Sequence, residues 1–182
     1  PDRDLRTKCI KGHLHFLGQQ DQQAEEVFRS VLRDAPGFAY AHYGLSLIFA
    51  EQNKPTAALD HALFASNVAA NDPRILAQLG YCYMLLNAYG AAEQHLQQAI
   101  KLAPKDKHSW NNLAIVSRLK GDPLNAKVCW LQALHIDPGY GQALDNLAHL
   151  DEELRQADMR IDVGMAPVPA NLTQVKPEAI PW

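Results

Sequence analysis

The 182-residue chain lacks any uninterrupted run of about 18 apolar residues, the length that a membrane-spanning helix needs. The sequence therefore predicts no membrane span. Clustered positive charge is also lacking: 17 lysines and arginines against 20 aspartates and glutamates leave a formal net charge of −3, with the basic residues scattered. Because binding to a phosphate backbone depends on dense positive charge, nucleic acid is not an expected partner.

Cysteine is scarce and unpaired in the sequence. Cys9, Cys82 and Cys129 form no CxxC pair, so we expect buried free thiols. Cys9, His13 and His15 are the one group with metal-ligand residue types. Cys9 and His13 would share a helix face as half of a site, but His15 points about 200° further round the helix. With no further ligands at a suitable spacing, we expect no metal, and a Cys and His that line a groove.

Catalytic motifs are missing as well. The sequence contains no G-x-S-x-G, H-E-x-x-H or G-K-[ST] pattern and no Gly-rich loop after a strand. Its Asp and Glu pairs fall on polar helix faces, where solvated charge is the usual state. The sequence thus predicts no catalytic residue, no cofactor and no enzyme activity.

An initiator methionine is absent, because the chain starts at Pro1. We interpret it as a processed product or an excised piece, which is compatible with a signal, anchor or upstream domain. The compartment stays open, with the cytoplasm favoured over the periplasm.

What the sequence does contain is a repeat with a period of 34 residues, which separates Pro104 from Pro138 and Leu79 from Leu113. A fixed period of this size indicates one supersecondary unit that is copied and stacked. The copy at 107–140 has large and small residues at set places: Trp110, Leu113, Ala114, Ser117, Ala126, Trp130, Ala133 and Pro138. The copy at 73–106 has Leu76, Leu79, Gly80, Tyr83, Ala92, Leu96, Ala99 and Pro104 at the same places.

This pattern resembles the tetratricopeptide repeat, a helix-turn-helix unit with the signature W-x2-L-G-x2-Y, A-x3-F and P. The resemblance implies an all-α fold, a right-handed α-solenoid of four such repeats. The repeats are placed at 5–38, 39–72, 73–106 and 107–140, followed by a capping helix at 141–160, and together they form a domain over 1–160. Lys8, Lys11 and His15 replace apolar residues in the first copy, which is expected to be an N-terminal cap.

Nine helices are expected, near residues 5–18, 21–34, 39–52, 55–69, 73–86, 89–102, 107–120, 123–136 and 141–159. Gly121, Asp122 and Pro123 supply a helix stop, an N-cap and a first-turn proline between two of them. Residues 161–182 leave the repeat and form an extended, apolar and Pro-rich tail.

The first helix of each copy carries a second stripe outside its core face. In the first copy this stripe includes Arg6 and Cys9, and the candidate binding residues are His13, Phe16, Tyr40, Tyr43, Leu47, Arg74, Tyr81, Met84, Leu85, Asn111, Ile115 and Arg118. The resemblance implies that they line a concave groove that holds an extended peptide or a partner helix. The alternative is that curvature of the superhelix merely buries them.

The groove is predicted to be apolar through the first three copies and polar to acidic afterwards, towards Asp145 and Glu152. Some tetratricopeptide proteins clamp the C-terminal carboxylate of heat-shock chaperones with cations and amides. This chain has Cys9, His13, Tyr43 and Gly44 at the corresponding positions, so that activity is not expected.

The tail is too apolar for a solvated linker, with Val163, Met165, Val168, Leu172, Val175, Ile180 and Trp182. We expect it to occupy the groove or a neighbouring chain, and the alternative is a linker. The predicted function is a non-enzymatic protein–protein interaction module, for example a bacterial secretion or pilus-assembly chaperone or scaffold. The alternative is a regulatory or docking segment of a larger enzyme. Partner identity and oligomeric state stay open.

Overall fold

The computed structural model describes the backbone of residues 2–162 and the side chains of residues 4–156. These residues form helices and no strand: α1 (Asp2–Leu17), α2 (Asp21–Asp34), α3 (Ala39–Glu51), α4 (Pro55–Val68), α5 (Pro73–Leu85), α6 (Tyr89–Leu102), α7 (Lys107–Leu119), α8 (Pro123–Ile136) and α9 (Gly141–Asp162). All nine helices expected from the sequence are present, with ends within three residues of the expected positions. The predicted tail lies outside the described residues.

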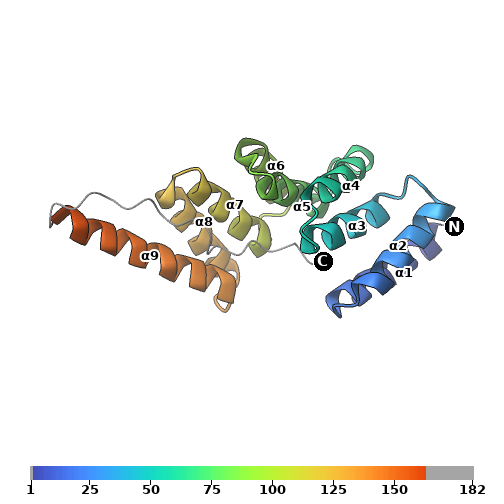
Figure 1. The fold of residues 1–182 in the computed structure, drawn as a ribbon, viewed down its shortest axis with the longest axis horizontal. Coiled ribbons are helices and arrows are strands. Elements are labelled where there is room, and N and C mark those ends of the chain that lie inside the picture. The colour runs from blue at the N-terminus through green and yellow to red at the C-terminus, as the bar shows by residue number, and fades with distance from the viewer. Residues whose placement is uncertain (1, 163–182) are drawn as a thin grey trace. The chain divides into compact units, whose positions relative to one another are not determined.

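The described chain divides into two compact units, one with α1–α6 up to Pro104 and one with α7–α9 from Lys105. In the first unit the hairpins α1–α2, α3–α4 and α5–α6 stack in chain order, and each first helix also contacts the next one (Figure 1). In the second unit α7 pairs with α8, and α9 packs on α8. The fold class, an all-α solenoid, is confirmed. The repeat limits and the domain boundary at residue 160 stay predictions.

Each hairpin closes around a buried stripe on its second helix, with a large residue in the centre in α2, α6 and α8 and only alanines in α4. The buried stripes are Ala24, Phe28 and Val31 on α2; Ala58, Ala62 and Ala65 on α4; Ala92, Leu96 and Ala99 on α6; and Ala126, Trp130 and Ala133 on α8. The facing first helix provides a small residue at the point of closest approach. A Cβ on Gly80 would lie only 2.8 Å from Leu96 Cγ. The three free cysteines are buried, as expected.

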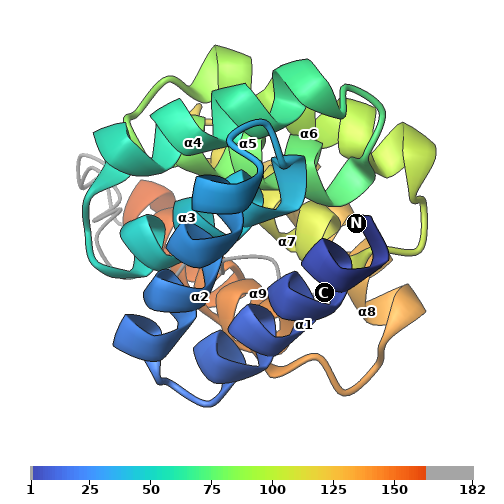
Figure 2. The ribbon, with the colours of Figure 1, turned by 90° about the vertical axis from the view of Figure 1, so that its right-hand side faces the viewer.

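The turn inside each hairpin uses one left-handed residue at the same place in every copy. Gln19, Asn53, Asn87 and Gly121 have φ values of 57°, 55°, 59° and 83°. In the turn at Asn53, the N–H of Lys54 donates to the carbonyl of Phe49 (2.8 Å) and that of Asn53 to Ala50 (3.1 Å). These two backbone hydrogen bonds end the helix and satisfy its last carbonyl groups. The corresponding turn at Gln19 places α1 and α2 side by side as the two helices of one hairpin (Figure 2).

Three aspartates start helices by accepting backbone N–H groups. Asp72 caps α5, Asp106 caps α7 and Asp122 caps α8, where the Asn125 N–H donates to Asp122 Oδ1 at 3.0 Å. The N-cap predicted at Asp122 is confirmed. Such a cap contributes about 1 kcal/mol, so these positions fix where a copy begins or turns.

Candidate functional site

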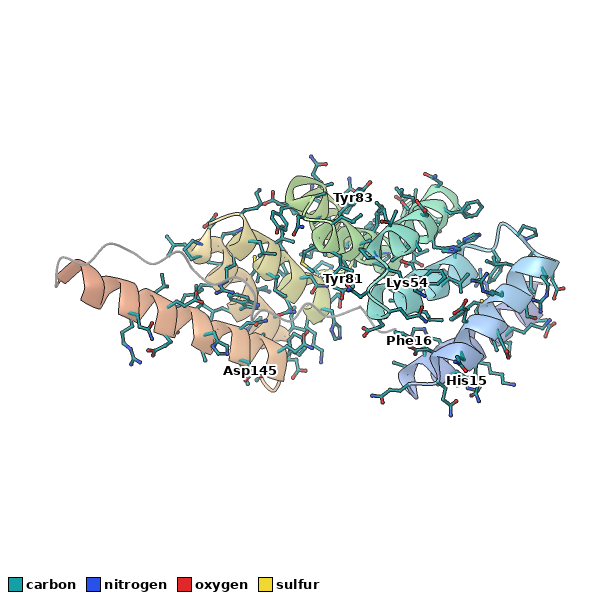
Figure 3. All side chains as sticks on the ribbon, viewed as in Figure 1. His15, Phe16, Lys54, Tyr81, Tyr83 and Asp145 are labelled. Carbon is teal, nitrogen blue, oxygen red and sulfur yellow. The ribbon has the colours of Figure 1, made fainter. Side chains whose placement is uncertain are left out.

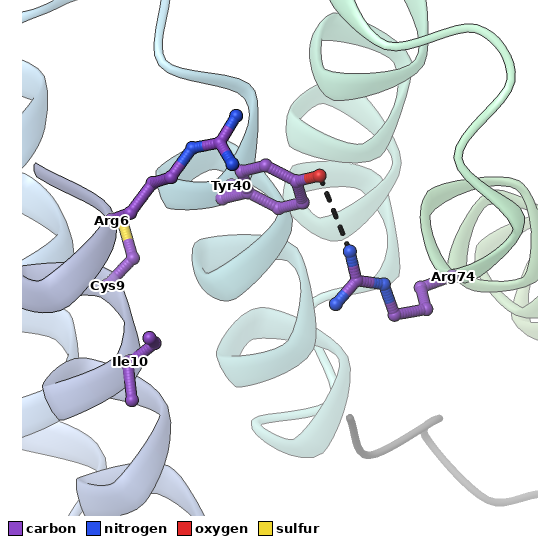
Figure 4. A pocket seen from close by; sticks show the side chains of 5 residues that line it. All are labelled: Arg6, Cys9, Ile10, Tyr40 and Arg74. Carbon is purple, nitrogen blue, oxygen red and sulfur yellow. Dashed lines mark hydrogen bonds between the residues drawn. The ribbon is translucent and has the colours of Figure 1, made fainter. Parts of the chain in front are cut away.

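The first helices of the first three copies, α1, α3 and α5, surround a pocket in the first unit. It has a volume of about 180 Å³, room for a few water molecules or one ligand side chain. Its lining residues are Arg6, Cys9, Ile10, Tyr40 and Arg74 (Figure 4). The pocket therefore combines two guanidinium groups with an aromatic ring and apolar side chains.

Tyr40 lies between the two arginines. The guanidinium carbon of Arg6 is 5.9 Å from the centroid of the Tyr40 ring and that of Arg74 is 5.3 Å away. Arg6 reaches the ring from α1 and Arg74 from α5, on opposite sides of the phenol in Figure 4. Both distances suit cation–π contacts, which hold the two side chains at the pocket.

Asp72 neutralises only one of these cations. Arg74 donates to the Asp72 carboxylate through Nη2 (2.9 Å) and Nε (3.2 Å), and the Tyr40 hydroxyl donates to it at 2.9 Å. Burial by itself raises the pKa of Asp72, but these hydrogen bonds outweigh it and the net pKa is lowered. Burial and Asp72 raise the pKa of Tyr40. At neutral pH Arg74 thus belongs to an ion pair with Asp72.

Arg6 is the remaining cation of the pocket. Among the side chains at residues 4–156 it forms no ion pair, and its guanidinium contacts the face of Tyr40. The residue is exposed. An anionic group that enters the pocket would therefore meet an uncompensated positive charge.

Cys9, which lines this pocket, and His13, one turn further along α1, are both buried and uncharged at neutral pH. Burial raises the pKa of the Cys9 thiol to about 12. Burial, together with the positive charge of Arg74, lowers the pKa of His13 to about 4. His15, which the sequence grouped with Cys9 and His13, forms a hydrogen bond with Gln20 instead (Nδ1 to Oε1, 2.6 Å). Within the described residues, no three potential ligands gather at one place.

The structure places most of the twelve predicted groove residues inside the protein. His13, Tyr43, Leu47, Tyr81, Met84, Asn111, Ile115 and Arg118 are buried, and Phe16, Tyr40, Arg74 and Leu85 are half-buried. Figure 3 labels Phe16 on α1 and Tyr81 on α5. Of the twelve, Tyr40 and Arg74 come together at the pocket. Burial is what the alternative interpretation of the stripe expects, and a binding role for all twelve residues stays a prediction.

The predicted residues of α7 have partners inside the second unit. Trp130 Nε1 donates to Asn111 Oδ1 at 3.0 Å, and Asn146 Nδ2 donates to the same oxygen at 3.3 Å. Arg118 forms an ion pair with Glu153 of α9. Asn111 and Arg118 therefore hold the second unit together.

Two residues of the pocket region escaped the sequence prediction. Asp72 was not among the candidate residues, although an Asp before Pro73 is an N-cap signal and a cap can also bind a side chain. Ile10 is on neither predicted stripe. Ile10 lines the pocket because of the distance between α1 and the neighbouring first helices, and the sequence does not indicate this distance.

None of the helices in residues 2–162 is long and apolar enough to cross a bilayer. Sequence models of the tetratricopeptide repeat match residues 19–72 and 73–106, two ranges that meet without a gap. Together with the stacked hairpins, these matches identify the class: the chain is a tetratricopeptide repeat protein. Stacked repeats of this kind provide extended surfaces for protein–protein interaction.

The chain is similar to the protein O-mannosyl-transferase TMTC1. It is 25% identical to the human protein and 24% identical to the mouse protein over 166 residues, which is 86% of this chain. The chain spans only 19% and 17% of the length of these relatives.

Solved structures share the fold. Pseudomonas aeruginosa PilF has a TM-score of 0.76 at 21% identity, over 94% of this chain and 80% of that chain. YrrB, described as a tetratricopeptide protein with an unusual peptide-binding site, has a TM-score of 0.64 at 19% identity, over 74% of this chain and 70% of that chain.

Proposed function

We propose that this chain is a non-enzymatic interaction module that binds an extended segment of a partner protein at the pocket between α1, α3 and α5. The observation that carries the proposal is the position of Arg6, whose guanidinium lies over Tyr40 at an apolar pocket and is not paired with a carboxylate of the described residues. A carboxylate of the ligand would provide the missing countercharge. An apolar ligand side chain beside it would contact Ile10 and Cys9.

The ionised Asp72 narrows the ligand chemistry. Because Asp72 is already bonded to Arg74 and Tyr40, the pocket keeps one net positive charge from Arg6. A basic ligand group would meet Arg6 and is disfavoured. The ligand expected here is a peptide with Asp, Glu or a C-terminal carboxylate next to an apolar residue. The structure of YrrB is described as having a peptide-binding site, which supports a peptide as the ligand.

Two finer roles remain proposals. A secretion or pilus-assembly chaperone or scaffold is one, and it rests on the small all-α repeat architecture alone. A docking segment of a larger enzyme is the other, and it is favoured by the similarity to TMTC1, a much longer protein named as an O-mannosyl-transferase. In both roles the chain itself binds a protein segment and performs no chemistry. Occupation of the groove by residues 161–182 also stays a proposal.

The test uses a random peptide library displayed on phage and the full chain as bait. Enriched peptides are synthesised with a fluorophore, and their affinity is measured by fluorescence anisotropy for the wild type and for Arg6→Gln. Because Arg6 is exposed, its replacement should leave the fold intact. We expect enrichment of acidic peptides and a loss of affinity of about tenfold in Arg6→Gln, since a charge-assisted hydrogen bond contributes on this scale.

Lys11→Gln is the matched control, because Lys11 is an exposed cation of the same helix outside this pocket. It should bind the peptides as the wild type does. Peptides that bind equally well to Arg6→Gln and to the wild type would remove the pocket as the binding site. An equal loss in both variants would mean that only the overall charge matters.

A further inference from the structure

Helix α1 presents an apolar stripe to solvent. Ile10, Leu14 and Leu17 are spaced i, i+4 and i+7 and are 53%, 64% and 53% exposed. This corrects the expectation of an N-terminal cap, because a capping helix needs a polar outer face. The sequence pointed to polar residues at Lys8 and Lys11, but these lie on other sides of the helix.

The equivalent positions in the later copies show what a residue at the Leu14 position contacts. The residues one, two and three periods after Leu14 are Ile48, Cys82 and Val116, and all three are fully buried. Cys82 Sγ, for example, lies 3.4 Å from Ser46 Oγ on the first helix of the preceding copy. The Leu14 position thus faces a neighbouring helix wherever the structure provides one.

Helix α9, at the other end of the repeat, lacks a partner: within residues 2–162 no second helix pairs with it. Leu144 is 46% exposed, and Ala148 beside it is also exposed. The residues two periods earlier, Leu76 and Gly80, are buried. Gly80 receives the large side chain of Leu96 from the second helix α6. Within residues 2–162, no helix therefore covers the face of α9 that would receive a second helix.

The stripe on α1 has the spacing of a second helix. Ala92, Leu96 and Ala99 of α6 are also at i, i+4 and i+7, with the large residue in the centre. In α1 the central residue is Leu14. The small residue of α9 that corresponds to Gly80 is Ala148. Leu14 can therefore face Ala148 as Leu96 faces Gly80, with the two helices further apart because Ala148 carries a Cβ.

The charges beside the two faces are complementary. Arg6 and Lys11 flank the stripe of α1, whereas Asp145 flanks the open face of α9, where Glu152 is already paired with Arg155 of the same helix. Asp145 projects from α9 in Figure 3, and neither it nor Lys11 forms an ion pair among the described side chains. Opposite charges of this kind orient one surface on another and disfavour the pairing of like surfaces.

We propose that copies of this chain associate head to tail, with α1 of one copy packed on α9 of the next and Leu14 against Ala148. The two faces differ, so the contact is heterologous and leaves a free α1 at one end and a free α9 at the other. Because a contact between two helices buries less than the ~1,200 Å² of a stable interface, we expect the association to be weak. The assembled fraction should therefore be substantial only at high protein concentration.

The experiment measures the molar mass of the full chain by sedimentation velocity over a range of concentrations. The wild type should form dimers and longer species as concentration rises. Leu14→Glu and Ala148→Glu each block one face and should raise the dissociation constant at least about tenfold, since apolar anchors dominate such contacts. Both residues are exposed, so the helical content should be unchanged, as circular dichroism will verify.

Mixing the two variants provides the decisive measurement. Leu14→Glu keeps an intact α9 and Ala148→Glu an intact α1, so together they should form a 1:1 heterodimer that grows no further. Leu124→Glu on α8, an exposed leucine outside both faces, is the control and should assemble like the wild type. A monomeric wild type, a Leu14→Glu chain that still assembles, or a mixture without heterodimer would each overturn the proposal. Assembly that is lost in Leu14→Glu but kept in Ala148→Glu would overturn it in favour of another partner for α1.

Discussion

The hydroxyl of Tyr40 donates a 2.9 Å hydrogen bond to the carboxylate of Asp72, 32 residues further along the chain. Asp72 is also the N-cap of α5 and accepts the backbone N–H of Arg74 at 3.0 Å. One carboxylate thus connects α3 of the second copy with the start of α5 in the third. The same carboxylate holds the Arg74 guanidinium at the pocket. The geometry of the candidate site therefore depends on the seam between two copies.

Tyr40→Phe removes this bond and leaves the ring between the arginines. We expect the free energy of unfolding to fall by about 1 to 2 kcal/mol, because a partly buried carboxylate loses one of its donors. Urea denaturation measures the change. The control is Tyr89→Phe, whose hydroxyl bonds to Asn87 at 2.7 Å on the surface and should change stability by less than about 0.5 kcal/mol. Equal stability of Tyr40→Phe and the wild type would show that the bond makes no net contribution.

Gly44→Ala tests how closely α3 approaches α2. A Cβ at Gly44 would lie 2.2 Å from Phe28 Cζ, and Phe28 is fully buried in the core. The ring must move, at a cost of about 1 to 3 kcal/mol. Gly90→Ala is the matched control, because nothing lies within 4 Å of its added Cβ and the helix should gain up to about 1 kcal/mol. Thermal denaturation will separate the two, and a neutral Gly44→Ala would contradict this packing.

Trp130→Ala removes the largest fully buried side chain of the protein's described part. It leaves a cavity and takes one donor from Asn111, so we expect a loss of about 3 to 5 kcal/mol. Its neighbour Leu131 is 48% exposed, and Leu131→Ala should cost less than about 1 kcal/mol. Chemical denaturation compares the two. A loss below about 1 kcal/mol for Trp130→Ala would disprove the register of the fourth copy.

Acidification should destabilise the first unit through His13. Its pKa is about 4 in the folded protein, against about 6.5 in the unfolded chain, because burial and Arg74 oppose its protonation. The unfolded state therefore binds more protons, and stability is lost as the pH falls below about 6.5. At pH 5 the loss from this residue should reach about 2 kcal/mol relative to pH 8.

Urea denaturation at pH 8, 6 and 5 measures this dependence, with His13→Leu as the comparison. The variant should keep only the weaker slope due to other groups, such as His61 and His95, whose pKa values are also lowered, mainly by burial. A His13→Leu chain with the full pH dependence of the wild type would contradict the assignment to His13.

Much of the architecture was readable from the sequence. The period that separates Pro104 from Pro138 predicted the stacked hairpins, and all nine helices are present. Helix starts and stops depend on a few adjacent residues, such as Asp122 before Pro123, so their chemistry is local. Gly121 was recognised as a turn residue, whereas Gln19 at the same place in the first copy was not, because glutamine rarely has a positive φ.

The candidate site was only partly predictable. Tyr40 and Arg74 are on the predicted stripe and do meet, but Tyr43 and Tyr81 from the same stripe are buried. A helical period indicates which residues share a face. It does not indicate how closely the neighbouring helix covers that face, because this distance depends on side chains of other copies.

The sequence by itself determined the repeat, the helices, the small-against-large core and the absence of known catalytic motifs, because each depends on residue types at short or fixed spacing. Only the tertiary structure decided that Tyr40 bonds to Asp72, that Arg6 is left as the cation of the pocket and that Leu14 is exposed. These properties arise from distances between residues far apart in the chain, and they follow from packing that no local pattern encodes.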